Sequence, residues 1–269
     1  MEIRINSKVY GIRDSLRDGW FIYQYQFTKI LLIILSINIP ISIITTTIRF
    51  LVLKGQSELA ISNTGIYFLT NIIITLLSFV ALIPTIGIAY LVEKTIKGEK
   101  ISWQRAMLYG FSRLFPAIGT SLLAFIIVWA LFFLIIPGII WAVYYSFILY
   151  VVALRQLNGK KALDYSKNLV KGQWWRVLGF FFFVGLMQFA IGFIIQRLFG
   201  LISANLFFNI IPNIIVLIIN MFFVIVIIIY FLNNDYRLHP KISRETLPLD
   251  SNPSIENSNS PDQIKGDQP

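Results

Sequence analysis

Two shortages limit the chemistry open to this sequence: it contains no cysteine, and His239 is its single histidine. Without cysteine there is no disulfide, no thiol nucleophile and no thiolate-bound metal. A lone histidine cannot form the acid–base pair on which many hydrolytic reactions depend. The motifs His-Glu-x-x-His, Gly-x-x-x-x-Gly-Lys and Gly-x-Ser-x-Gly are also absent. We therefore expect no enzymatic activity, no catalytic residue, no metal and no cofactor.

Acidic residues are scarce as well, and the excess of basic residues is regularly distributed. The chain has 13 acidic and 23 basic residues, and its net charge is +10. All basic residues except Arg49, Lys54 and Arg197 lie in four separate segments, 1–29, 94–113, 155–176 and 233–269. A nucleic-acid-binding chain would gather its basic residues into one patch or stripe. The spread over four segments therefore excludes nucleic acid as the expected partner.

Long apolar stretches separate the basic segments. They cover residues 30–48, 66–92, 114–136, 139–154, 177–195 and 210–232, in a chain that is 57% hydrophobic. A helix needs about 20 apolar residues to cross a bilayer. The sequence predicts an all-α polytopic membrane protein whose six transmembrane helices form one domain, residues 1–247. The polar residues 248–269 predict a disordered cytoplasmic tail.

The alternation of basic segments and apolar stretches also predicts a topology. Cytoplasmic loops retain Lys and Arg, so both termini should be cytoplasmic. The first apolar stretch is longer than the core of a signal peptide, and we expect an uncleaved first span. The composition, rich in Ile, Asn and Lys, favours a bacterial protein. The expected location is the cell membrane, with multiple passes.

The centres of the six predicted spans contain no charged residue. Arg49, Glu93, Arg155 and Arg197 fall near the ends of spans, where a long side chain can reach the interface. This placement argues against ion coupling through a buried charge pair. Polar residues inside the spans, such as Asn213, could line a polar path, but we expect hydrogen bonds between helices. Pro84 predicts a kink in the second span.

Three short segments that precede spans one, three and five are alike. Residues 15–20, 106–111 and 162–167 each combine small, apolar and aromatic residues and lead into a span. One interpretation is three repeats of an interfacial amphipathic helix followed by a transmembrane hairpin. The other is that basic amphipathic segments commonly precede membrane spans.

The third of these segments is the most specific part of the chain. Ala162, Leu163, Leu169 and Val170 share a helix face. Pro137-Gly138 predicts a tight turn between spans three and four. We expect the segment to lie in the cytoplasmic interface, where its basic and aromatic side chains contact lipid. The candidate lipid-interface residues are Lys160, Lys161, Lys167, Lys171, Trp174, Trp175 and Arg176.

The Pro137-Gly138 turn and the run from Ala162 to Arg176 resemble the bacterial glycerophosphodiester phosphodiesterase membrane domain and the related YciC-like integral membrane proteins. The resemblance covers about spans three to five. It implies a six-helix membrane module with little settled biochemistry. Relatives commonly carry an acidic residue shortly before the Ala-Leu pair, whereas residues 154–157 here read Leu-Arg-Gln-Leu, so that residue's role does not transfer. The catalytic domain fused to some relatives has no counterpart here.

Two functional hypotheses follow. The first is a non-enzymatic multi-pass protein that engages anionic headgroups at the cytoplasmic surface and serves membrane or envelope homeostasis, or assists another membrane system. The second is a transporter or permease subunit, including one for export of, or immunity against, membrane-active peptides. Possible partners are another membrane protein or an ATP-binding subunit, and association with an ATP-binding subunit would favour the second hypothesis.

Overall fold

The computed structural model describes residues 11–59, 64–132, 135–200 and 206–239, and over these residues the chain forms helices and no strand. Six helical stretches are long and apolar enough to cross a membrane: Phe27–Ile48, Phe68–Ile96, Trp103–Ala130, Pro137–Arg155, Trp174–Phe199 and Pro212–Leu238. The chain is therefore an all-α, multi-pass membrane protein, as the apolar stretches predict. The predicted tail, 248–269, lies outside the described residues.

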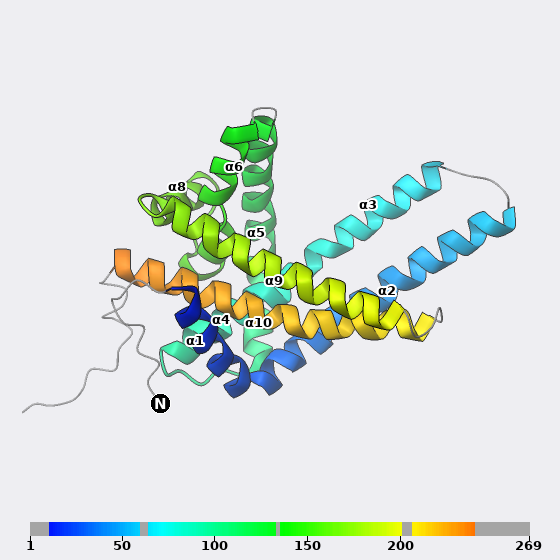
Figure 1. Cartoon of the computed structure of the whole chain (residues 1–269), viewed down its shortest axis with the longest axis horizontal. Helices are drawn as coiled ribbons and strands as arrows, with labels where there is room; N and C mark the ends of the chain where they lie inside the picture. Colours follow the sequence, from blue (N-terminus) through cyan, green and yellow to red (C-terminus); the bar gives the residue numbers. More distant parts are fainter. Residues whose placement is uncertain (1–10, 60–63, 133–134, 201–205, 240–269) are drawn as a thin grey trace, which may run out of the picture.

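Three helical hairpins make up most of the molecule. They are α2 (Phe27–Leu59) with α3 (Thr64–Val80), α5 (Trp103–Phe132) with α6 (Ile135–Tyr144), and α9 (Trp174–Gly200) with α10 (Leu206–Leu238). Figure 1 shows the three hairpins extending in different directions from a shared end, where α1 (Ile12–Tyr25), α4 (Leu82–Ile96) and α8 (Lys160–Val170) lie. Large apolar side chains such as Ile73, Phe125 and Phe189 are exposed along the hairpins, as lipid-facing surfaces require.

Two of the predicted spans are interrupted. The second divides at Ala81 into α3 and α4, so Pro84 lies in the first turn of α4 and not in a kinked continuous helix. The reason is that proline lacks an N–H group and clashes with the preceding turn, whereas the first turn of a helix accepts it. The fourth span breaks at residues 145–147, after which come the short α7 (Ile148–Tyr150) and a π-helical turn, η1 (Val151–Arg155).

The same rule for proline corrects the predicted turn at Pro137-Gly138. Both residues lie in the first turn of α6, and the connection from α5 to α6 passes through residues 133–134, outside the described residues. The first turn is where a helix tolerates proline best, because the N–H that proline lacks would have no intrahelical partner there. The hairpin itself is present, since α5 and α6 pack against each other.

Of the three segments predicted to be amphipathic helices before a span, two lie in helices of their own and one is the beginning of a longer helix. Residues 15–20 lie in α1 and residues 162–167 in α8, but residues 106–111 are the beginning of α5, which runs from Trp103 without a break. This part of α5 packs on α4 through two close approaches. A β-carbon on Gly87 would lie 2.9 Å from the carbonyl oxygen of Ala106, and one on Gly110 would lie 2.5 Å from that of Ile83. One face of the second segment, with Ala106, Met107 and Gly110, is thus buried, while Leu108 and Phe111 are exposed.

Aromatic side chains build the core where the three hairpins meet. The rings of Phe180 and Tyr230 stack with centroids 3.8 Å apart, and Phe147 packs against Tyr230 and Phe231. Towards the other end of the α9–α10 hairpin, Gln196 donates a hydrogen bond to Asn213 over 3.0 Å. Asn213 therefore joins two helices, as expected for a polar residue within a span.

Candidate functional site

A buried ionic cluster lies where the three hairpins converge. The Arg155 guanidinium donates from Nε to Asp235 Oδ2 over 2.6 Å and from Nη1 to Glu93 Oε1 over 2.7 Å. The side chains of Arg155, Glu93 and Asp235 are 10%, 5% and 0% exposed. One guanidinium thus bridges two carboxylates, using the planar fork that makes Arg suited to such contacts.

Three more side chains complete the cluster. Lys97 Nζ lies 3.1 Å from Glu93 Oε1, and the Tyr236 hydroxyl donates to the same oxygen over 3.4 Å. The Tyr165 hydroxyl, from α8, donates to Asp235 Oδ1. Two basic groups therefore balance two carboxylates. This balance is what allows charges to remain buried, because an unpaired ion away from water is strongly unfavourable.

Each hairpin contributes one member of the central triad. Glu93 stands near the end of α4, which follows the first hairpin, Arg155 ends η1, which follows the second, and Asp235 is in the last turns of α10. Gln156, directly after Arg155, has a left-handed backbone with a φ of 56° and ends the π-helical turn. Such turns are rare and occur frequently at functional sites. The cluster therefore joins all three hairpins at one end.

The sequence interpretation of these residues was wrong. Glu93 and Arg155 do not extend to an interface from the ends of their spans, because they pair with each other inside the protein. No pattern in the sequence of the separate spans indicated that Asp235, Tyr165 or Tyr236 belongs to a site. One regularity could have found part of the cluster: Tyr150 precedes Arg155 by five residues, and Tyr230 precedes Asp235 by the same interval.

Tyr165 lies outside the candidate spans, and partial burial changes the pKa of its hydroxyl group. Removal of its hydroxyl from water raises the pKa of Tyr165, because the phenolate would lose its hydration, and the neighbouring Asp235 carboxylate raises that pKa further. Tyr165 is therefore a neutral donor at physiological pH. It ties α8 to the end of α10.

The predicted lipid-interface residues divide into two groups. Lys167 and Trp174 are engaged with α6: Lys167 Nζ lies 4.7 Å from the centre of the Trp141 ring, and Trp174 Nε1 donates to the carbonyl oxygen of Ile140 over 3.3 Å. The others are exposed and lie on α8, at the start of α9, or between these helices: Lys160, Lys161, Lys171, Trp175 and Arg176. Trp175 is 79% exposed. We call this second group the α8–α9 basic surface.

The apolar face of α8 is as predicted, but it contacts protein. Ala162, Leu163, Leu169 and Val170 are all buried, and between them Ser166 Oγ donates to the carbonyl oxygen of Tyr144 over 2.8 Å. Beyond α8, Arg237 Nη2 donates to Gln173 Oε1 over 2.8 Å and fastens the α8–α9 connection to α10. Because the apolar face of α8 contacts protein, the part of this segment that is free to contact lipid is the α8–α9 basic surface.

Within the described ranges, no three histidine or acidic side chains come close enough together to hold a metal ion. Comparison with protein-family models, curated proteins and solved structures gave no match. The resemblance to the phosphodiesterase membrane domain and YciC-like proteins therefore stays a prediction.

Proposed function

We propose that this chain is a non-enzymatic multi-pass protein of the bacterial cell membrane that engages anionic lipid headgroups and serves membrane homeostasis, with both termini in the cytoplasm. The observation that carries the proposal is the α8–α9 basic surface. Its four basic side chains and Trp175 are exposed beside the start of a candidate span at Trp174. Each Lys or Arg near an anionic surface contributes about 1 kcal/mol of attraction.

Two further features support this role. Trp175 is exposed in the first turn of α9, and tryptophan at the end of a span prefers the level between headgroups and acyl chains. The apolar face of α8 is already occupied by protein, so this helix is held in a fixed place and its lysines are presented outward. A fixed array of charges loses less conformational freedom on binding lipid than a mobile one.

The test compares full-length protein in nanodiscs of phosphatidylcholine with and without phosphatidylglycerol, with the thermal unfolding midpoint as readout. A ligand that binds the folded state raises this midpoint. We expect phosphatidylglycerol to stabilise the wild-type protein, and the variant K160Q/K161Q/K171Q to lose most of that gain. High salt should reduce the gain as well, because exposed charges are screened.

The matched control is K160R/K161R/K171R, which keeps the three charges at the same positions. It should respond to phosphatidylglycerol as the wild type does. Equal stabilisation of wild type and the Gln variant would contradict the proposal. Reporter fusions at each terminus test the topology separately, and a periplasmic location for either terminus would overturn it.

A specific observation also favours transport as a second candidate. Two candidate spans are discontinuous, at Ala81 and at residues 145–147, and ionisable groups are buried at their ends. Discontinuous helices and buried ionisable residues are features of transporters. If the chain is a permease subunit, cross-linking in intact membranes should capture an ATP-binding subunit whose ATPase rate rises when this chain is added. No change in the ATPase rate would argue against this candidate.

A further inference from the structure

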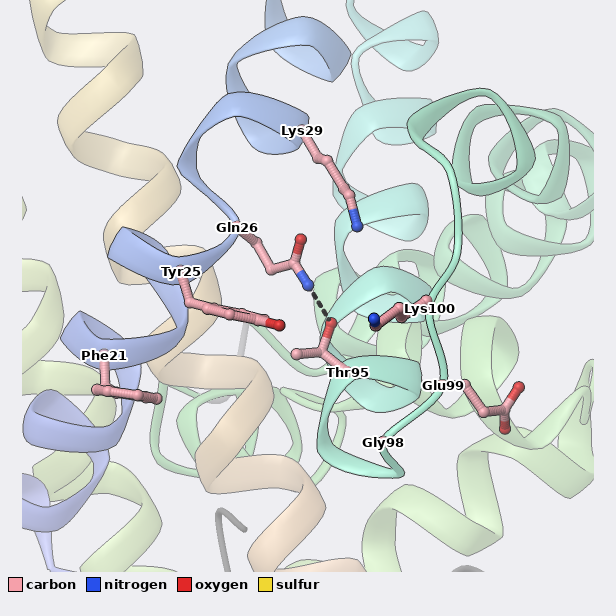
Figure 2. A pocket seen from close by; sticks show the side chains of 8 residues that line it. All are labelled: Phe21, Tyr25, Gln26, Lys29, Thr95, Gly98, Glu99 and Lys100. Atoms are coloured by element: carbon pink, nitrogen blue, oxygen red, sulfur yellow. Dashed lines mark hydrogen bonds between the residues drawn. The ribbon is translucent and has the colours of Figure 1, made fainter. Parts of the chain in front are cut away.

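A pocket of about 450 Å³ lies between the α1–α2 junction and the end of α4, and none of its lining residues belongs to the α8–α9 basic surface. Its walls come from Phe21, Tyr25, Gln26 and Lys29 on one side and Thr95, Gly98, Glu99 and Lys100 on the other (Figure 2). One candidate span begins at Phe27 and another ends at Ile96. The pocket therefore lies at the boundary of two spans, the level at which lipid headgroups are found.

Two lysines in the pocket have no acidic partner in the part of the chain that the structure describes. Figure 2 shows the ammonium groups of Lys29 and Lys100 directed toward the same opening. Glu99 also lines the pocket, but both its oxygens accept hydrogen bonds from Lys94, over 2.6 and 2.7 Å. The carboxylate of Glu99 points away from the two lysines (Figure 2). The opening therefore carries two unneutralised positive charges.

The base of the pocket is neutral and held in place. Gln26, buried in the break between α1 and α2, donates from Nε2 to Thr95 Oγ1 over 3.0 Å. Thr95 in turn donates to the carbonyl oxygen of Leu91 over 2.7 Å. Gly98 has a φ of +76°, a left-handed conformation that turns the chain after α4 and brings Lys100 back over the pocket. Lys100 is thus positioned by the backbone.

We infer that this pocket binds an anionic phosphate ester, one whose phosphate charge is not offset by a cation in the same headgroup. Two convergent ammonium groups match a phosphate monoester or diester, which offers several anionic acceptor oxygens. Tyr25, which is exposed at the rim, gives an aromatic surface for the part of the ligand next to the phosphate. A lipid headgroup and a soluble phosphate ester share this chemistry. The inference goes beyond the proposed function because it concerns different residues and does not depend on which leaflet they face.

The experiment uses native mass spectrometry of the full-length protein in detergent to measure binding of phosphatidylglycerol, phosphatidylcholine and glycerol 1-phosphate. Every protein in this test carries K160Q/K161Q/K171Q, which removes three lysines of the α8–α9 basic surface, and on this parent the variant K29Q/K100Q removes both charges from the pocket. The control R13Q/R105Q removes two exposed charges that do not line it. We expect the parent and R13Q/R105Q on that parent to bind phosphatidylglycerol alike, and K29Q/K100Q on that parent to bind it at least about tenfold more weakly.

Comparison of phosphatidylglycerol with glycerol 1-phosphate distinguishes a lipid headgroup from a soluble phosphate ester as the ligand. Lysine-dependent binding of phosphatidylglycerol without glycerol 1-phosphate supports the site and assigns it to lipid. Lysine-dependent binding of glycerol 1-phosphate supports it as a site for the phosphate ester itself. Equal binding by K29Q/K100Q and its parent, or equal binding of phosphatidylcholine and phosphatidylglycerol by the parent, overturns the inference. Because the parent already lacks Lys160, Lys161 and Lys171 of the α8–α9 basic surface, this outcome is distinguishable from failure of the proposed function.

Discussion

Arg155 and Asp235 are 80 residues apart in the chain, and the Arg155 Nε donates to Asp235 Oδ2 over 2.6 Å. This contact joins the second hairpin to the third, and the bond from the same guanidinium to Glu93 adds the first. The hairpins extend in different directions from this end (Figure 1), so the cluster and the aromatic core beside it hold the hairpins in one arrangement.

The first prediction concerns removal of the shared cation. Arg155→Met leaves Glu93 and Asp235 buried without their main partner, and breaking a buried ion pair in this way costs about 3–5 kcal/mol. We expect a large fall in the thermal unfolding midpoint of the protein in detergent. The midpoint of Arg155→Lys should lie between those of wild type and Arg155→Met, since lysine keeps the charge but cannot contact both carboxylates through a planar fork.

Two further variants isolate the effect of the pairing. Arg13→Met removes an exposed guanidinium from α1 and should leave the midpoint nearly unchanged. The quadruple variant E93L/K97M/R155M/D235L removes all four charges of the cluster together and should recover much of the loss, because no ion is left unpaired. A midpoint for Arg155→Met equal to that of wild type would show that the cluster does not hold the hairpins together.

The second prediction concerns the contact between α4 and α5. Gly110→Ala would place a methyl group 2.5 Å from the carbonyl oxygen of Ile83, and this backbone atom cannot move without shifting α4. Overpacking of this kind costs about 1–3 kcal/mol. Gly119→Ala, on the same helix, meets nothing within 4 Å and should be neutral or slightly stabilising. Equal midpoints for the two variants would contradict the close approach.

The third prediction concerns Tyr165 at alkaline pH. Its pKa is raised in the folded protein, so the stability it contributes is complete below the ordinary tyrosine pKa and is lost as the pH rises above about 10. We expect the stability difference between wild type and Tyr165→Phe to be constant near neutral pH and to shrink above that value. Chemical unfolding at several pH values measures it. A difference that grew above pH 10 would contradict the raised pKa.

The candidate site shows where prediction from sequence stopped. The exposed Lys160, Lys161, Lys171, Trp175 and Arg176 could be found, because alternation of basic and apolar segments places such side chains beside a span. Lys167 and Trp174 belong to the same pattern, yet they contact α6, which only the folding of distant segments brings near. The pattern places these side chains near a candidate span, but it cannot distinguish a partner in the protein from one in the membrane.

The sequence by itself determined that the chain is helical and crosses a membrane several times, because runs of about 20 apolar residues have no other stable arrangement in a bilayer. It also fixed the apolar face of α8, since a period of 3.6 residues is a local property. The tertiary structure alone decided that Glu93, Arg155 and Asp235 meet. Each is an ordinary charged residue near the end of its helix, and the low energy of burying it arises only when the oppositely charged groups arrive from the other hairpins.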